Sequence, residues 1–169
     1  MSTLEGRVAV ITGGGQGLGR EYARRLLRAG AKVAIVDVVH DAAAAAAAEF
    51  ARDCGPDRVL AHTCDVSDES AVAAMVQRVT EAWSGPFVLV NNAGGALLPS
   101  APMESFSRVE WDRVLGVNLT GAWLCAKAIT PRMRADGYGK IINVSSTMVS
   151  KAWPVGLVPY MAAKAGVSA

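Results

Sequence analysis

The stretch TGGGQGLG, at residues 12–19, decides the fold of this chain of 169 residues. It follows a short apolar run, RVAVIT at residues 7–12, and leads into residues 18–29, which have helical spacing. Glycines between a strand and a helix permit a tight turn and let backbone N–H groups approach a pyrophosphate at the helix N-terminus. The strict G-x-G-x-x-G fingerprint is absent, and the spacing is G-xxx-G-x-G from Gly13 to Gly19. A glycine-rich turn without a ligand is the alternative, but the position between strand and helix favours phosphate binding.

Strands and helices alternate along the rest of the chain. Runs rich in β-branched residues predict further strands at residues 32–38, 58–63, 86–91 and 140–145. Helical spacing or alanine-rich composition predicts further helices at residues 41–52, 69–83 and 107–135, and a last helix that begins near residue 157. This alternation indicates right-handed βαβ units and an α/β fold, a Rossmann-type doubly wound parallel sheet with helices on both faces. Residues 1–169 show no linker and no internal repeat, which predicts a single dinucleotide-binding domain.

The composition is typical of a soluble, core-forming protein, with 51% hydrophobic and 19% charged residues. The net charge is only +2 and no basic block occurs, so neither a nucleic acid nor a membrane surface is an expected partner. No apolar run approaches the ~20 residues of a membrane helix. A signal-peptide pattern is also absent, and we expect a cytoplasmic protein. The three cysteines lack CxxC spacing and clustered histidines, so no metal site or disulfide framework is predicted.

Asp37 stands at the end of the second predicted strand. A carboxylate at this point can accept hydrogen bonds from both ribose hydroxyls of an adenosine and would repel a 2′-phosphate. No Arg or Lys lies in residues 13–19 or directly after Asp37 to bind such a phosphate. The pattern therefore favours NAD over NADP. An aspartate that only caps the following helix is the alternative.

Further motifs follow in the order that the short-chain dehydrogenase/reductases show, and the chain resembles that family over essentially its whole length. TGxxxGxG matches residues 12–19, DV matches residues 65–66, NNAG matches residues 91–94 and YxxxK matches residues 160–164. In the family the DV pair contacts the adenine ring, and NNAG lies beside the cofactor. The resemblance implies that the cofactor is held by Gly13, Gln16, Gly17, Leu18, Gly19, Asp37, Asp65, Val66, Asn92, Ala93, Gly94, Tyr160 and Lys164.

The resemblance also implies a catalytic tetrad of Asn118, Ser146, Tyr160 and Lys164. Tyr160 and Lys164 are four residues apart and share one helix face, where the ammonium would stabilise the phenolate. Tyr160 is then expected to take the alcohol proton while hydride leaves for NAD, or to return it in ketone reduction. By resemblance, Lys164 holds the nicotinamide ribose and Asn118 anchors a water in a proton relay. A core tyrosine, a surface lysine and a locally bonded asparagine are the structural alternatives.

The position of the catalytic serine departs from the family pattern. Its hydroxyl would hydrogen-bond the substrate oxygen and stabilise developing alkoxide charge. Ser146 precedes Tyr160 by fourteen residues and Ser145 by fifteen, whereas thirteen is usual in the family and falls on Thr147. One extra residue in the loop before Tyr160 would explain the offset. Ser146 is therefore the first choice, Ser145 the second and Thr147 the third.

The loop before Tyr160 lines the substrate pocket in the family. Here it is largely apolar, which points to a hydrophobic or aromatic secondary alcohol or the matching ketone. A Trp153 that merely packs against a neighbouring helix is an equal alternative. The residues concerned are Met148, Trp153, Pro154, Val155 and Leu157, with Lys151 as the single charge. By analogy, a homodimer or homotetramer would form through residues 107–135 and the helix of Tyr160.

Relatives continue through two further strands, so we expect a C-terminally truncated domain whose fifth strand is an open edge. Three functions compete. The first is an NAD-dependent oxidoreductase acting on a secondary alcohol or ketone. The second is an NADPH-dependent 3-oxoacyl carrier-protein reductase, against which Asp37 argues. The third is a truncated, non-catalytic nucleotide-binding or interaction module, which would have no use for the Tyr160 and Lys164 pair.

Overall fold

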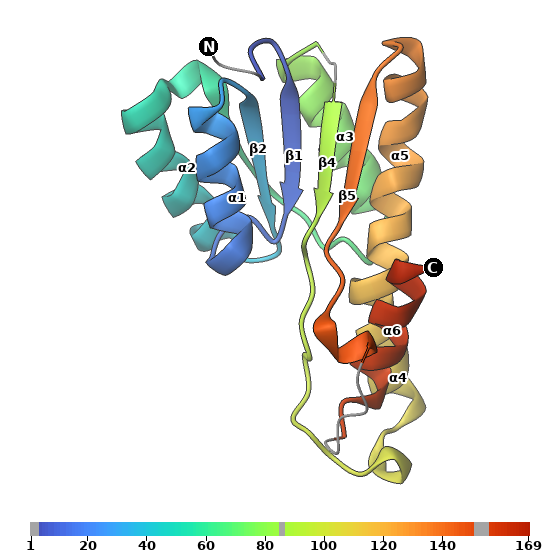
Figure 1. The fold of residues 1–169 in the computed structure, drawn as a ribbon. Coiled ribbons are helices and arrows are strands. Elements are labelled where there is room, and N and C mark those ends of the chain that lie inside the picture. Colours follow the sequence, from blue (N-terminus) through green and yellow to red (C-terminus); the bar gives the residue numbers. More distant parts are fainter. Residues whose placement is uncertain (1–3, 85–86, 151–155) are drawn as a thin grey trace.

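A parallel sheet forms the centre of the computed structural model, which describes residues 4–84, 87–150 and 156–169 (Figure 1). The five strands lie in the order β3-β2-β1-β4-β5. They are β1 (Val8–Thr12), β2 (Lys32–Asp37), β3 (Val59–Thr63), β4 (Phe87–Asn91) and β5 (Gly139–Asn143). The strand order reverses between β1 and β4, and in open α/β sheets ligands bind beyond the carboxyl ends of the strands at such a point.

Helices cover both faces of the sheet (Figure 1). Helices α1 (Gly17–Arg28) and α2 (His40–Cys54) pack on one face, where Ala9 and Ile11 of β1 belong to the buried cluster. Helices α3 (Glu69–Ala82) and α5 (Gly121–Ala135) pack on the other, against Val8 and Val10. Residues of β1 thus alternate between two buried faces, as expected for the central strand of a parallel sheet. The predicted doubly wound α/β fold is confirmed.

The remaining helices lie beyond the carboxyl ends of the strands. Helices α4 (Arg108–Leu115) and α6 (Val158–Ser168) pack against each other there (Figure 1). Three single 3₁₀ turns, η1 (Pro56–Arg58), η2 (Met103–Ser105) and η4 (Thr147–Val149), connect the larger elements. No helix in the described ranges is both long and apolar enough to cross a bilayer.

The long helix predicted over residues 107–135 is present as a continuous helical stretch from Arg108 to Ala135, but it contains a π-helical turn that was not predicted. Ser107 caps α4 through a capping box with Glu110, and α4 ends at Leu115. A π-helical turn, η3 (Gly116–Thr120), then precedes α5. Apolar spacing did not reveal this turn, because one wider turn leaves the polar and apolar faces of the surrounding helix almost unchanged.

Two strand ends were also predicted too late. The second strand was expected to reach residue 38 but ends at Asp37, and the fifth was expected to reach residue 145 but ends at Asn143. In each case the neighbouring strand ends at the paired residue. Asp37 of β2 pairs with Thr63, the last residue of β3, and Asn143 of β5 pairs with Asn91, the last residue of β4. β-branched residues continue past these points, so the composition could not mark the ends.

Strand β5 forms one edge of the sheet. Ile141 and Ile142 are 41% and 50% exposed, whereas every residue of β1 and β4 is buried. The predicted open edge at the fifth strand is therefore present.

Candidate active site

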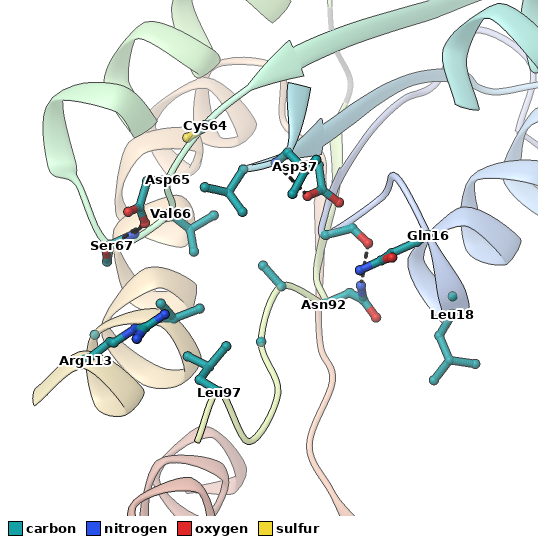
Figure 2. A pocket seen from close by; sticks show the side chains of 18 of the residues that line it. Gln16, Leu18, Asp37, Cys64, Asp65, Val66, Ser67, Asn92, Leu97 and Arg113 are labelled. Atoms are coloured by element: carbon teal, nitrogen blue, oxygen red, sulfur yellow. Dashed lines mark hydrogen bonds between the residues drawn. The ribbon is translucent and has the colours of Figure 1, made fainter. Parts of the chain in front are cut away.

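A cleft of about 900 Å³ opens beyond the carboxyl ends of the strands (Figure 2). Most residues expected to hold the cofactor line it, namely Gly13, Gln16, Gly17, Leu18, Asp37, Asp65, Val66, Asn92, Ala93 and Gly94. Gly19, Tyr160 and Lys164 are not among the lining residues. The fold therefore collects residues from four separate motif positions, far apart in the sequence, around one space.

The glycine turn is shaped by close backbone contacts. Gly17 begins α1 with φ +54°, a conformation that costs an L-residue about 1–2 kcal/mol. Gly19 has a different role, because a Cβ there would collide with the carbonyl of Gly13 and the side chain of Asn92. Gln16 is the N-cap residue of α1, but its side chain accepts no hydrogen bond from the helix. The Gln16 side chain therefore does not compete with an anion for the first N–H groups of α1.

Thr12 and Asn92 fasten the glycine turn to the end of β4. The Thr12 hydroxyl accepts hydrogen bonds from the backbone N–H groups of Asn92 (3.1 Å) and Ala93 (3.0 Å). In return, the Asn92 amide donates to the carbonyls of Thr12 (3.0 Å) and Gly13 (3.1 Å). Asn92 was expected to contact the cofactor, whereas sequence reasoning gave Thr12 no role of its own. Its place as the first letter of TGxxxGxG was the available signal.

Asp37 presents its carboxylate to the cleft while being only 7% exposed. One oxygen accepts the N–H of Gly15 (3.0 Å) and the other that of Val39 (3.1 Å). An ionised carboxylate has about four acceptor positions, so capacity for two ribose hydroxyls remains. Asp37 does not cap α2, because the N-cap residue is Val39 and it has no side-chain cap.

The loop after β3 forms the wall that faces the glycine turn. Asp65 accepts hydrogen bonds from the N–H and hydroxyl of Ser67 (2.9 and 2.7 Å), which fix the loop. Val66 is only 6% exposed, and a Cβ on Gly121 would lie 2.7 Å from its side chain. The close approach of α5 thus holds this wall in place.

Asn118 lies in the π-helical turn and is 1% exposed. Its carbonyl accepts the N–H of Gly95, and its amide donates to the carbonyls of Gly95 and Val114, all at 3.0 Å. The Asn118 side chain therefore fixes the backbone at Gly95, the residue that directly follows the NNAG motif. A mid-helix asparagine that bonds locally was one of the structural alternatives, and the bond to Val114 is of this kind.

Lys164 reaches from α6 to the end of β5. Its ammonium donates to the carbonyl of Val144 (2.8 Å), its side chain is only 4% exposed, and burial lowers its pKa. A Cβ on Gly94 would lie 3.5 Å from the Lys164 Nζ and would overlap the Asn118 carbonyl oxygen. Gly94 lines the cleft, so this glycine is the point where the cleft meets Lys164. Lys164 is therefore buried, and the structural alternative of a surface lysine does not apply.

Tyr160 is half-buried on α6, one turn before Lys164, and the Lys164 Nζ lies 6.0 Å from the centre of its ring. The Ser145 hydroxyl is hydrogen-bonded to α6. It donates to the carbonyl of Lys164 (3.3 Å) and shares a hydrogen bond with the Ser168 hydroxyl (2.5 Å). Ser146 instead accepts the N–H of Met148 (3.2 Å) and donates to no described residue, so its O–H remains available. Thr147 is exposed in η4.

A small apolar hollow adjoins Tyr160. It is lined by Ala96, Leu98, Pro99, Phe106, Val114, Leu157, Pro159 and Tyr160 itself. Of the loop residues expected to line the substrate pocket, Leu157 is among these, and Met148 lies beside Ser146. Lys151, Trp153, Pro154 and Val155 lie outside the described residues.

Several lining residues of the cleft were not anticipated. Val117 directly precedes Asn118, and Arg113 is one helical turn earlier, so helical spacing back from Asn118 could have indicated both. The others have no motif of their own. They are Val38, Val39, Cys64, Ser67, Leu97, Asp112 and Gly116.

Two of the thiols are buried in the same core cluster, and one of them, Cys64, also lines the cleft. Burial raises the pKa of Cys64 to about 11 and that of Cys125 to about 12. Cys54, Cys64 and Cys125 are all free cysteines. No group of three or more His, Cys, Asp or Glu side chains that could hold a metal occurs within the described part of the chain.

Comparison with known proteins agrees with this geometry. Residues 7–169 match the family model described as short chain dehydrogenase. The chain is 40% identical over 169 residues to an uncharacterized oxidoreductase of Thermotoga maritima, covering 98% of this chain and 63% of the relative. It is 42% identical over 162 residues to a cis-4-hydroxycyclohexanecarboxylate dehydrogenase of Sinomonas cyclohexanicum, covering 96% and 63%.

A solved structure shows the same fold. The crystal structure of levodione reductase superposes with a TM-score of 0.90 at 37% identity, covering 97% of this chain and 63% of the other. The chain thus spans less than two thirds of the length of these relatives. With the family model matched from residue 7 to residue 169, the chain belongs to the short chain dehydrogenase family.

Proposed function

We propose that the protein is an oxidoreductase that transfers a hydride between NAD and a secondary alcohol or ketone, with Tyr160 as the general acid and base. The observation that carries this proposal is the junction at Gly94. Its backbone lines the nucleotide-sized cleft and lies against Asn118 and Lys164. A cleft for a dinucleotide and a buried lysine for proton chemistry therefore share one wall.

NAD fits the residues that line the cleft. The uncapped start of α1 offers N–H groups to a pyrophosphate, and the Asp37 carboxylate retains acceptor capacity for two ribose hydroxyls. A 2′-phosphate would meet the negative charge of Asp37, which favours NAD over NADP. When bound, the nicotinamide supplies the acceptor or donor of the hydride.

Proton transfer falls to Tyr160. Its hydroxyl would take the proton of the alcohol or return it to the carbonyl oxygen of a ketone. Lys164 lies on the same helix face and is anchored by the carbonyl of Val144, so its Nζ is held near the tyrosine. The ammonium stabilises negative charge on the phenolic oxygen, and this is the role we assign to it.

Ser146 is our choice to hold the substrate oxygen. Its hydroxyl keeps a donor that no described residue takes up, whereas the Ser145 hydroxyl is bonded to α6. A donor directed at the reacting oxygen stabilises the charge that develops there. Asn118 positions the segment around Gly95, and we assign it this positioning role along with its expected part in the proton relay.

The substrate is proposed to carry an apolar body next to its hydroxyl or carbonyl group. The hollow beside Tyr160 is too small to hold a ligand itself, but apart from Tyr160 its lining side chains are apolar, so the surroundings of the tyrosine suit hydrocarbon rather than charge. The name of the Sinomonas relative describes an alcohol on a cyclohexane ring. A cyclic secondary alcohol is therefore the first substrate to try.

Self-assembly is a further part of the proposal. Val109 on α4 and Trp123 on α5 are 78% and 57% exposed, and these helices are the expected contact between subunits. We propose a homodimer or homotetramer. Light scattering of the purified protein gives its mass directly, and a monomer at micromolar concentration would contradict this part.

Turnover tests the proposal. Reduced nicotinamide is followed by absorbance when the protein is mixed with cyclohexanol-type alcohols and either NAD or NADP. We expect turnover with NAD, a loss of about 10²-fold or more in Tyr160→Phe and Ser146→Ala, and retention in Ser145→Ala. Turnover that survives Tyr160→Phe, or that needs Ser145 rather than Ser146, would contradict the assignment.

A further inference from the structure

Arg113 is a cation at the cleft that no known motif accounts for. Among the described residues it is the only basic side chain that lines the cleft, and it forms no ion pair or hydrogen bond with any of them. Its neighbour Asp112 is held by Arg108 (2.7 Å), so it does not neutralise Arg113. A solvated arginine would be ordinary on an open surface, but this one stands at the edge of a binding space.

The helix face that carries Arg113 looks toward the loop after β3. Gly116 follows three residues later and shares that face, and a Cβ there would lie 3.7 Å from the Cβ of Ser67. In Figure 2 Arg113 lies across the cleft from Gln16 and Leu18, on the side of Asp65 and Ser67. Arg113 is therefore remote from the glycine turn, where the pyrophosphate would bind.

The cleft also offers exposed apolar side chains that suit a flat group. Val38 and Val39, which follow Asp37, are 63% and 52% exposed, and Leu97 is 39% exposed. With the pyrophosphate at α1 and the ribose on Asp37, the adenine base of a dinucleotide would extend past Asp37 toward the ends of β2 and β3. The base would cover these exposed side chains with one face and leave its other face open on the side of α4.

We propose that the Arg113 guanidinium covers this open face by stacking on the adenine base, and so sets the affinity of the site for adenine nucleotides. The inference rests on the proposed function. A guanidinium is planar, weakly hydrated and stacks on aromatic faces, which a lysine ammonium does not do equally well. Since Arg113 has no partner to give up, the contact with the base replaces only solvent.

The test is calorimetric binding to the 169-residue chain, with three probes. ADP-ribose and AMP carry adenine, whereas nicotinamide mononucleotide does not. In Arg113→Ala we expect the dissociation constants of ADP-ribose and AMP to rise about tenfold, the scale of one stacked cation–π contact, and that of nicotinamide mononucleotide to stay the same. Arg113→Lys should recover less than half of the lost binding free energy, because it restores the charge but not the plane. Arg134→Ala, an exposed arginine outside the cleft without a described partner, serves as the matched control.

Three results would overturn the inference. Wild-type affinity for ADP-ribose in Arg113→Ala would show that the arginine is only solvated. Full affinity in Arg113→Lys would show that charge alone matters, and equal weakening of nicotinamide mononucleotide would show a general effect on the cleft. If the wild-type chain binds neither ADP-ribose nor AMP, the proposed function fails first and the inference fails with it.

Discussion

The nucleotide region and the reaction region of this chain are built in different ways. Around the glycine turn, β1 and β4 are wholly buried, and the turn is fixed by backbone contacts such as Gly19 on the carbonyl of Gly13. The reaction region stands on β5, an edge strand with Ile141 and Ile142 about half exposed. Its serines bond to close neighbours, Ser145 to α6 and Ser146 to Met148.

This difference implies that binding and turnover depend on different parts of the molecule. Positions in the nucleotide region are packed from both sides of the sheet, so changes there should cost stability and nucleotide affinity together. Changes on β5 should cost little stability. Lys164 joins the two regions, because it is buried and adjoins the cleft at Gly94 while serving Tyr160.

The largest expected effect is a truncation in the buried sheet. Ile35→Ala on β2 should lower the free energy of unfolding by about 2–5 kcal/mol, because Ile35 is 0% exposed and its loss leaves a cavity. Ile142→Ala, the same change on β5, should cost less than about 1 kcal/mol at 50% exposure. Urea unfolding of both variants measures the contrast. Equal losses would show that β5 is packed as tightly as β2.

A methyl group at the glycine turn should have the next largest effect. Gly19→Ala forces a Cβ against the Gly13 carbonyl and the Asn92 side chain, and overpacking of this kind costs about 1–3 kcal/mol. ADP-ribose affinity should fall with it. Gly116→Ala is the matched control, since its Cβ would meet only an ordinary 3.7 Å contact and should be neutral or slightly stabilising. Thermal unfolding and calorimetry of the two variants decide the matter, and a harmless Gly19→Ala would refute the steric account of the turn.

Removing the Thr12 hydroxyl should be slightly less costly. Thr12→Val keeps the shape but leaves the N–H of Ala93 without its acceptor, a loss of about 1–3 kcal/mol, while the N–H of Asn92 keeps a second acceptor in the carbonyl of Val90 (3.1 Å). Thr12→Ser retains the hydroxyl and should recover most of that stability. Denaturant unfolding of both variants provides the measurement. A Thr12→Val protein as stable as wild type would mean that water replaces the hydroxyl.

The last effect, a pH dependence from the buried thiols, is confined to alkaline solution. Their pKa values rise from 9.0 to about 11 for Cys64 and to about 12 for Cys125 on folding. Above pH 9 the unfolded chain therefore loses these protons before the folded one, so the free energy of unfolding should fall as the pH rises from 9 toward 12. Cys125→Ala should make this decline shallower, whereas Val72→Ala, which opens space in the same core cluster, should leave its slope unchanged. Parallel slopes in all three proteins would exclude the thiols as the cause.

Much of the nucleotide region could be predicted from the sequence because its constraints are local. A glycine turn between a strand and a helix and an aspartate at a strand end each leave a pattern within a few residues. The π-helical turn at Gly116–Thr120 could not be predicted, since helical periodicity tolerates one wide turn. The free hydroxyl of Ser146 also could not, because the difference from Ser145 arises only when α6 packs against β5. Arg113 carries no motif, and only the approach of α4 to Ser67 gives it a place at the cleft.

The central claim is that the cleft, independently of the reaction region, binds NAD and rejects a 2′-phosphate through Asp37. Calorimetric titration of the wild-type chain and of Ser146→Ala with NAD and NADP tests it most directly. The account predicts that both proteins bind NAD with equal affinity and that NADP binds at least about tenfold more weakly, as one unpaired like-charge contact implies. NADP binding as tight as NAD binding, or loss of NAD binding in Ser146→Ala, would contradict it.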